Sequence, residues 1–453
     1  MDILIKIAQL FLCFTILVGI HELGHFLMAR AFKIRVEKFY IFFDPWFSLF
    51  KFKRGDTEYG LGWLPLGGYV KIAGMIDESM DKEQMKQPVK PDEFRAKPAW
   101  QRLLVMVAGV MMNVLLAIVI YCAVCYTWGD SYFSNQDAKW GYNFNPTAHE
   151  MGFRDGDRFV SIDGEEIDNV MRVQNDLLIT DGGRRVVVER GGEPVTLDIP
   201  FESLLRMRQE KAYEDLFTLR LPFIVDSVSY TSAVEAGLQS GDEVVAIDDL
   251  RDADYPRYRD YLQKHKNDKV LLTVRRDGAL IDSLALPVDA EGRIGVTVTN
   301  PYSLRTQYYT FWESIPAGIH KAGKTISSYW DQLKLIVQPK TKMYEELGGF
   351  VAIGSIFPGS WDWHDFWLKT AFLSIILAVM NLLPIPGLDG GHALFTLWEI
   401  ITRRKPSEKF LEVAQYVGLM IILALLVYAN GNDIYRFLSL IHISEPTRLA
   451  LIS

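Results

Sequence analysis

The chain has 453 residues, long enough for about two to four domains, with 49% hydrophobic and 23% charged residues and a formal net charge of −8. This acidic balance argues against a nucleic-acid-binding protein, because there is no basic surplus to neutralise phosphates. Three cysteines do not form a disulfide framework, and the Cys122/Cys125 pair, in an apolar stretch, is interpreted as packing.

Four apolar stretches approach the length of a membrane-spanning helix, which needs about 20 apolar residues. They cover Ile3 to about Phe32, Leu103 to Tyr126, Phe366 to about Ile400, and Val413 to Tyr428. The first stretch lacks the basic start and the small-residue cleavage site of a signal peptide, so we expect it to remain in the protein. The sequence therefore predicts a polytopic α-helical membrane protein with four transmembrane helices.

The end of the first stretch carries three ionisable residues in the sequence HELGH: His21, Glu22 and His25. Residues i and i+4 share one face of a helix, with Cβ atoms about 5–6 Å apart, so both imidazoles can reach one zinc ion. Glu22 then lies beside the metal, where a general base for the attacking water belongs. Alternatively, the three are polar residues satisfied between helices, although ionisable residues inside a membrane are usually functional.

The long charged region between the second and third stretches contains a repeat. AHEMGFRDGDRFVSIDG from Ala148 and AVEAGLQSGDEVVAIDD from Ala233 align without gaps. In each copy a short helix ends at a glycine, and a Gly-Asp turn leads into an apolar strand. The pattern resembles the PDZ domain in its bacterial strand order, twice in tandem, whereas two unrelated β-rich domains are the alternative. PDZ domains bind extended peptides by strand addition.

Two segments between the repeat and the third stretch have mixed character. Residues 301–336 place aromatic, apolar and cationic residues at helical spacing. This is typical of an amphipathic helix at the membrane surface, which could act as a gate, and equally of a connecting core helix. The apolar, Gly-rich segment 348–363 ends in Trp361 and Trp363, which favours a re-entrant or interfacial position.

The third stretch is interrupted by LLPIPGLDGG, whose prolines and glycines prevent a continuous helix. Irregular backbone at membrane depth is tolerated only where it is buried in protein or lines a wet cavity. Asp389 lies in this interruption and is the candidate third zinc ligand, because a carboxylate beside zinc is far less costly than one in lipid. His392 is a rival ligand. Asn381 could bind substrate backbone or a developing oxyanion.

Basic residues predict the orientation, because they are concentrated in two of the connecting loops. One loop contains Arg30, Lys33, Arg35, Lys38, Arg95, Lys97 and Arg102, and the other contains Arg403, Arg404, Lys405 and Lys409. By the positive-inside rule both loops are cytoplasmic. The N-terminus and the region 128–365 then face the other side, which in a bacterium is the periplasm.

The motifs together resemble the site-2 protease family of intramembrane zinc metalloproteases, and within it the bacterial inner-membrane members with tandem PDZ domains. The resemblance rests on HELGH in a first span, NLLPIPGLDGG in a penultimate span and PDZ-like repeats between them, from residue 1 to about residue 438. It implies that His21, His25 and Asp389 bind Zn2+, that Glu22 is the catalytic base, and that Asn381 contacts substrate.

The segment LPLGGYVKIAGM at 64–75 resembles the family's membrane-embedded β element, whose edge strand pairs with an unwound substrate. The residues that this resemblance assigns to substrate binding are Gly68, Tyr69, Val70, Lys71 and Ile72. One departure lies in the second span, where Val110 stands in place of a proline that many relatives have, while Asn113 is retained. This departure concerns a local kink and not the chemistry.

The predicted organisation follows from these assignments. Residues 1–127 hold two spans, HExxH and a cytoplasmic β-hairpin loop; 128–213 and 214–300 are the PDZ-like domains; 301–365 is the linker; and 366–438 hold the last two spans with Asp389. The tail 439–453, SLIHISEPTRLALIS, fits neither a span nor a cap and looks like read-through from an expression vector. We exclude it, with its His442, from functional reasoning.

The predicted function is hydrolysis of peptide bonds within or near the transmembrane segment of membrane proteins. The resemblance implies an anti-sigma factor as substrate, and remnant signal peptides are a second possibility. Two rival functions are a non-catalytic PDZ membrane adaptor, which would need no metal, and a metal transporter, which usually has repeated transmembrane segments. A further hypothesis is that the two PDZ-like domains exclude substrates with large domains outside the membrane.

Overall fold

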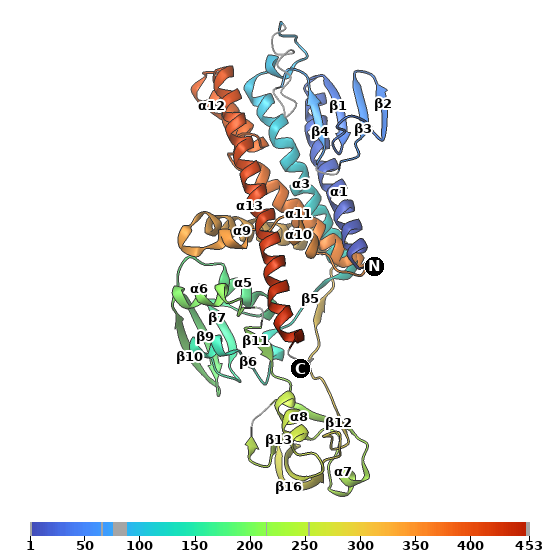
Figure 1. Ribbon diagram of the computed structural model, residues 1–453, viewed down its shortest axis with the longest axis vertical. Helices are drawn as coiled ribbons and strands as arrows, with labels where there is room; N and C mark the ends of the chain where they lie inside the picture. Colours follow the sequence, from blue (N-terminus) through green and yellow to red (C-terminus); the bar gives the residue numbers. More distant parts are fainter. Residues whose placement is uncertain (1, 65–66, 76–87, 214, 252–253, 450–453) are drawn as a thin grey trace. The chain divides into compact units, whose positions relative to one another are not determined.

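The computed structural model describes residues 2–64, 67–75, 88–213, 215–251 and 254–449, so Pro65 and Leu66 of the predicted β element lie outside it. The chain divides into two compact units (Figure 1). Unit 1 comprises Met1–Asp130 and Tyr308–Ser453, and unit 2 comprises Ser131–Gln307. Each unit is described by itself below.

Among the described residues of unit 1, four helices are long and apolar enough to cross a membrane, which agrees with the predicted number of spans. The apolar segments are Asp2–Ala31 in α1, Ala99–Trp128 in α3, Trp363–Leu382 in α11, and Lys409–Arg436 in α13 (Glu408–Leu449). The third apolar stretch is interrupted, as its prolines and glycines predicted, and its first half is the candidate span. Helix α11 ends at Leu382, and α12 (Asp389–Thr402) is a separate helix, because the prolines between them interrupt helical hydrogen bonding.

A small sheet follows α1 in unit 1 (Figure 1). Its strands are β1 (Val36–Ile41), β2 (Phe50–Arg54), β3 (Thr57–Leu61) and β4 (Tyr69–Ile72), in the order β2-β3-β1-β4. β2 and β3 form a hairpin, whereas β1 is parallel to β3 and antiparallel to β4. The predicted hairpin loop is therefore a four-stranded sheet in which β4 is an edge strand.

The linker between unit 2 and the third span is largely helical. Helix α9 (Phe311–Val337) starts with a capping box formed by Thr310 and Glu313. It packs closely on α3, because a Cβ at Gly318 would lie 2.5 Å from the Cys122 nitrogen and sulfur atoms. Its opposite side exposes large apolar residues such as Trp312. The helix is therefore both a packed connecting helix and an amphipathic one.

Short elements complete unit 1. The segment predicted to be re-entrant contains α10 (Phe350–Ser355), and the Val351 and Ala352 amides donate to Asp433 Oδ2 on α13 at 3.0 and 3.1 Å. The single-turn 3₁₀ helices are η1 (Phe94–Ala96), η4 (Pro339–Thr341) and η5 (Met343–Glu346).

Unit 2 contains two hydrophobic cores, one for each copy of the repeat. The first copy has a sheet in the order β10-β9-β7-β8 and a separate β6–β11 pair, and the second has β16-β15-β13-β12-β17 with β14 paired to β13. A further pair joins β5 (Asp130–Tyr132) to β18 (Arg305–Gln307).

The elements of the two copies have the following bounds. The first copy comprises η2 (Asn135–Asp137), β6 (Tyr142–Phe144), α4 (Pro146–Glu150), β7 (Arg158–Ile162), β8 (Glu165–Glu166), η3 (Val170–Arg172), α5 (Val173–Leu178), β9 (Arg184–Arg190), β10 (Glu193–Ile199), α6 (Phe201–Gln209) and β11 (Phe217–Leu219). The second comprises β12 (Phe223–Val228), α7 (Thr231–Glu235), β13 (Glu243–Ile247), β14 (Leu250–Arg251), α8 (Tyr255–Lys264), β15 (Lys269–Arg276), β16 (Ala279–Pro287) and β17 (Val296–Val298).

The aspartate of each repeated Gly-Asp turn is buried and ion-paired. Arg190 donates through Nε and a terminal guanidinium nitrogen to both oxygens of Asp157, at 2.8 and 2.7 Å. Arg276 binds Asp242 in the same way, at 2.6 and 2.7 Å. Two-pronged pairing of this kind fixes the geometry of both partners. The repeated aspartates therefore hold the turn that leads into β7 or β13.

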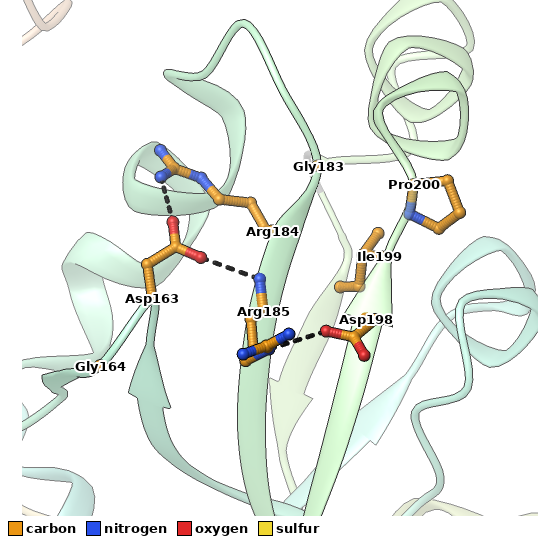
Figure 2. A pocket seen from close by; sticks show the side chains of 8 residues that line it. All are labelled: Asp163, Gly164, Gly183, Arg184, Arg185, Asp198, Ile199 and Pro200. Atoms are coloured by element: carbon orange, nitrogen blue, oxygen red, sulfur yellow. Dashed lines mark hydrogen bonds and ion pairs between the residues drawn. The ribbon is translucent and has the colours of Figure 1, made fainter.

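A surface pocket of about 640 Å³ lies on the first copy of the repeat (Figure 2). It is lined by Asp163, Arg184, Arg185 and Asp198, and these form ion pairs with one another. Partial burial raises the pKa of Asp163, but the Arg185 amide and the Arg184 guanidinium outweigh this and hold that pKa below its ordinary value. The charges lining this pocket are thus neutralised by each other, and we assign it a structural role.

Candidate metal centre

Helix α1 carries His21, Glu22 and His25 near its C-terminal end, and all three line one pocket of about 960 Å³ in unit 1. Both histidines are buried, with 8% and 7% of their surface exposed, whereas Glu22 is half-buried. The α-helix continues through the HELGH sequence, so the two imidazoles lie one turn apart on one face.

Asp389 is brought to the histidines by the break between α11 and α12. It is the first residue of α12, where a carboxylate is stabilised by the helix dipole. Close packing in the break depends on glycine: a Cβ at Gly390 would lie 2.3 Å from the Leu383 carbonyl oxygen, and one at Gly391 would lie 2.5 Å from that of Ile385. The glycines therefore let the start of α12 fold back against the irregular segment and direct Asp389 into the pocket.

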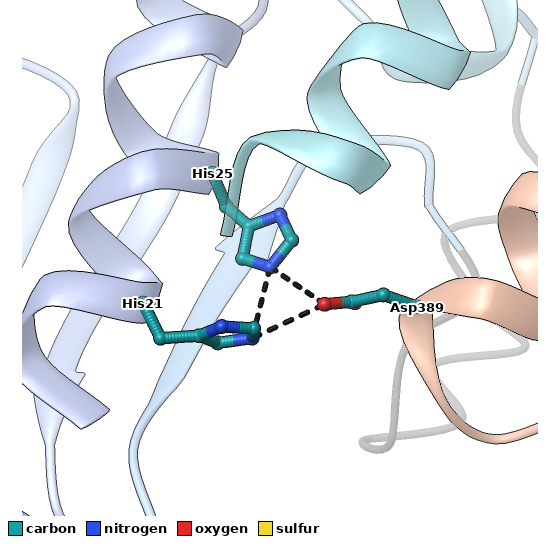
Figure 3. A group of neighbouring side chains, drawn as sticks. All are labelled: His21, His25 and Asp389. Carbon is teal, nitrogen blue, oxygen red and sulfur yellow. Dashed lines mark hydrogen bonds and ion pairs between the residues drawn. The ribbon is translucent and has the colours of Figure 1, made fainter. Parts of the chain in front are cut away.

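The three side chains converge on one point (Figure 3). Asp389 Oδ2 lies 3.1 Å from His21 Nε2 and 3.2 Å from His25 Nε2, and the two Nε2 atoms lie 3.3 Å apart. Donors about 2.0–2.1 Å from a tetrahedral zinc ion are themselves about 3.3 Å apart. Two imidazole nitrogens and one carboxylate oxygen are a donor set that zinc accepts, so these residues fit a zinc ion in both chemistry and spacing.

The orientation of His25 is determined by α3. His25 Nδ1 lies 2.8 Å from the Val105 carbonyl oxygen. A carbonyl only accepts, so Nδ1 carries the proton and the Nε2 lone pair points toward the donor cluster. The sequence analysis missed this contact, because a backbone carbonyl leaves no signature in residue types.

Helix α3 also leaves space for the imidazoles at Gly109. A Cβ there would lie 2.3 Å from His25 Nε2 and 2.7 Å from His21 Cε1. Asn113, one turn further along α3, lies with its Nδ2 3.4 Å from His21 Nδ1. Gly109 and Asn113 were not assigned to the site from the sequence, although a glycine and an amide four residues apart in an apolar stretch are a detectable signal.

Two further predicted residues approach the same cluster. Asn381, near the end of α11, has its Nδ2 3.3 Å from His21 Nε2, so it faces the donors. Val70 of β4 lines the same pocket as Glu22. A Cβ at Gly68 would lie 3.4 Å from Glu22 Cγ, so the chain before β4 passes close to α1.

The structure thus gathers every site residue predicted from the sequence around one pocket. The lining includes His21, Glu22, His25, Gly68, Tyr69, Val70, Lys71, Ile72, Asn381 and Asp389. The rival ligand His392 also lines it, but the group of donors within 4.8 Å of one another, among the residues that the structure describes, is His21, His25 and Asp389.

Comparison with known proteins extends over nearly the whole chain. Residues 9–425 match the family described as Peptidase family M50. A protein of Clostridium perfringens named as a zinc metalloprotease is 29% identical over 427 residues, which cover 93% of this chain and 96% of the relative. The regulator of sigma E protease of Haemophilus influenzae is 27% identical over 460 residues, covering 96% of this chain and 100% of the relative. A Vibrio cholerae protein, also named as a zinc metalloprotease, is 29% identical over 462 residues, covering 96% and 99%.

Proposed function

The chain belongs to peptidase family M50, the zinc-dependent intramembrane proteases, and from this premise we propose that His21, His25 and Asp389 hold the zinc ion and that Glu22 is the catalytic base. The observation that carries this assignment is the convergence of three donor atoms 3.1–3.3 Å apart beside Glu22. The alternative function, a non-catalytic PDZ membrane adaptor, needs no metal. It would not explain why two imidazoles and a carboxylate converge inside an apolar helical unit.

The residues of the site have distinct tasks in peptide hydrolysis. Zinc, when bound, supplies Lewis-acid polarisation of the scissile carbonyl. Glu22 accepts a proton from the attacking water and later returns it to the leaving amine. Asn381 projects into the same space from α11, and its amide donates either to substrate backbone or to the oxygen that gains negative charge.

Removal of the metal tests the assignment directly. We expect a chelator such as 1,10-phenanthroline to abolish cleavage of a membrane-spanning reporter by the purified protein in detergent. Addition of zinc in slight excess over the chelator should restore cleavage, because the donor set is already assembled by the fold. Cleavage that continues in protein shown by elemental analysis to hold no metal would contradict the proposal, and metal-independent binding of peptides alone would favour the adaptor.

We further propose that β4 holds the substrate in an extended form. A transmembrane helix satisfies its backbone groups internally and must be unwound before hydrolysis. β4 is an edge strand that borders the pocket, and Val70 lines this pocket together with Glu22. A substrate strand added at this edge would therefore lie next to the proposed base.

The sheet that contains β4 also has features suited to contact with lipid. Large apolar side chains are exposed on β2 and the loop before it, among them Trp46, with 92% of its surface accessible, and Phe50, with 62%. Basic residues alternate with the aromatic ones in the β2 sequence FKFKR. This composition favours a position at the membrane boundary, in agreement with the proposed membrane-embedded element.

Replacement of Val70 by proline tests substrate pairing, because proline removes the amide hydrogen. We expect cleavage of a helical membrane substrate to fall about 3- to 10-fold more than cleavage of a short peptide with the same scissile sequence, since about one hydrogen bond is lost. Initial rates on the two substrates give the ratio. Val70→Ala, which keeps the amide, is the matched control. Equal losses on both substrates with Val70→Pro would argue against pairing at β4.

The natural substrate is proposed from the comparisons. The relative from Haemophilus influenzae is named a regulator of sigma E protease. We propose a single-span anti-sigma factor as substrate, with remnant signal peptides as a second candidate. The two copies of the repeat in unit 2 are proposed to be PDZ-like domains that bind extended peptide segments.

We propose that the protein lies in the bacterial inner membrane with its N-terminus and unit 2 in the periplasm and the loop at Arg403–Lys405 in the cytoplasm. The basic residues of the two loops support this orientation. Introduced cysteines at the exposed positions Glu193 and Arg404 provide the test. A membrane-impermeant maleimide that crosses only the outer membrane should label Glu193→Cys and leave Arg404→Cys unlabelled. The reverse pattern would overturn the orientation.

A further inference from the structure

The two proposed histidine ligands are supported by α3 through their Nδ1 atoms. His25 Nδ1 meets the Val105 carbonyl at 2.8 Å, and His21 Nδ1 meets the side-chain amide of Asn113 at 3.4 Å. Val105, Gly109 and Asn113 are successively four residues apart, so they lie along one face of α3. That face borders both imidazoles.

Asn113 is completely buried, and only one of the two polar atoms of its side-chain amide has a hydrogen-bond partner in the described part of the chain. None of its side-chain surface is exposed, and its Oδ1 has no hydrogen-bond partner among the residues that the structure describes. An unpaired buried oxygen is energetically costly, so such a group usually has a partner in the working protein. The nitrogen and oxygen of an amide exchange places by rotation about one bond, and their assignment depends on the hydrogen-bond network.

The chemistry of the ligand decides which end of the amide faces His21. A neutral imidazole that binds a metal through Nε2 carries its proton on Nδ1 and needs an acceptor there. Val105 supplies that acceptor for His25, since a carbonyl cannot donate. With Nδ2 toward His21 Nδ1, Asn113 instead favours the opposite tautomer, in which Nε2 is protonated and faces Asp389 at 3.1 Å. Rotation of the amide places Oδ1 where Nδ1–H needs it.

We propose that Asn113 is a positioning residue of the metal site, whose Oδ1 accepts a hydrogen bond from His21 Nδ1–H and so directs the His21 Nε2 lone pair to zinc. This inference rests on the proposed function, in which His21 is a zinc ligand. It pairs the amide oxygen with the ring proton that zinc ligation through Nε2 requires, and it assigns a role to an amide buried in an apolar helix. Asn113 acts through His21 and does not itself touch the reacting atoms.

The test compares Asn113→Leu with Asn113→Asp in the full-length protein. Leucine has a similar size without an acceptor, so we expect zinc affinity to fall about 10- to 100-fold, as for other groups that orient a metal ligand. Aspartate keeps an acceptor oxygen and should retain the wild-type affinity or exceed it. Affinity is measured by competition with a chromophoric chelator, and the cobalt-substituted proteins report ligand geometry through their visible absorption.

Two controls separate this inference from general damage and from the proposed function. Gln9→Leu removes another fully buried amide, one on α1 that donates to the Pro358 carbonyl, and should leave zinc affinity unchanged. Unchanged affinity in Asn113→Leu, or an equal loss in Asn113→Asp, would overturn the role of Asn113, and the aspartate variant alone decides if the leucine variant does not fold. If His21→Ala also retained full zinc affinity, the ligand assignment itself would fail.

Discussion

Replacement of Glu22 by glutamine is expected to slow cleavage of a membrane-spanning reporter by about 10²- to 10⁴-fold, the usual contribution of a general base. Glutamine has nearly the same shape as glutamate but cannot take a proton from water near neutral pH. Zinc content should not change, because Glu22 is not one of the three clustered donors. Purified variant and wild type are compared in detergent by initial cleavage rate and by elemental analysis.

Glu313→Gln is the matched control for this experiment. Glu313 belongs to the capping box of α9, in which glutamine can serve as well as glutamate, so cleavage should be unaffected. Equal cleavage by Glu22→Gln and wild type would assign the base to another residue or reveal a contaminating protease. Loss of zinc from Glu22→Gln would instead mean that Glu22 contributes to binding the ion.

The second large effect is expected from Asp389→Asn. We expect zinc affinity to fall by more than about 100-fold, beyond the roughly 10- to 100-fold loss typical of groups that only orient a ligand. The amide keeps the size of the side chain but removes the negative charge from the oxygen that lies 3.1 and 3.2 Å from the two histidine nitrogens. Cleavage should fall with zinc occupancy. Chelator competition and reporter cleavage measure the two quantities.

Asp365→Asn controls for the loss of a carboxylate from the same unit. Asp365 lies in the first turn of α11 and pairs with Lys369, away from the donor cluster, so zinc affinity should remain at the wild-type level. Zinc affinity that survives in Asp389→Asn but falls in His392→Ala would assign the third ligand to His392, which lines the same pocket.

Local patterns predicted the elements that carry the chemistry. HELGH lies on one continuous helix, and LLPIPGLDGG interrupts the third apolar stretch, because helical periodicity and proline act over a few residues. Asp389 was chosen over His392 because an unpaired carboxylate in lipid is energetically costly. A carboxylate at membrane depth therefore needs a partner such as a metal ion, whatever the tertiary structure is. The third span is shorter than its apolar stretch, because α11 ends at Leu382, and the expected hairpin is part of a four-stranded sheet.

Contacts between distant segments could not be predicted in the same way. Nothing in the residue types shows that Val105 supplies its carbonyl to His25, or that Gly109 lies where a methyl group would collide with both imidazoles. These relations depend on how closely α1 and α3 approach and on their rotation about their own axes. Those quantities depend on the packing of all the helices of the unit together.

Four apolar stretches, a metal-binding pattern on the first and a break in the third that holds an aspartate could all be read from the residue order alone. Each of these depends on neighbours within one or two helical turns. Long-range packing brings Asp389 to His21 and His25, places β4 along the same pocket as Glu22, and turns Asn113 toward His21. Such contacts need the simultaneous packing of segments that lie tens to hundreds of residues apart, which no local pattern encodes.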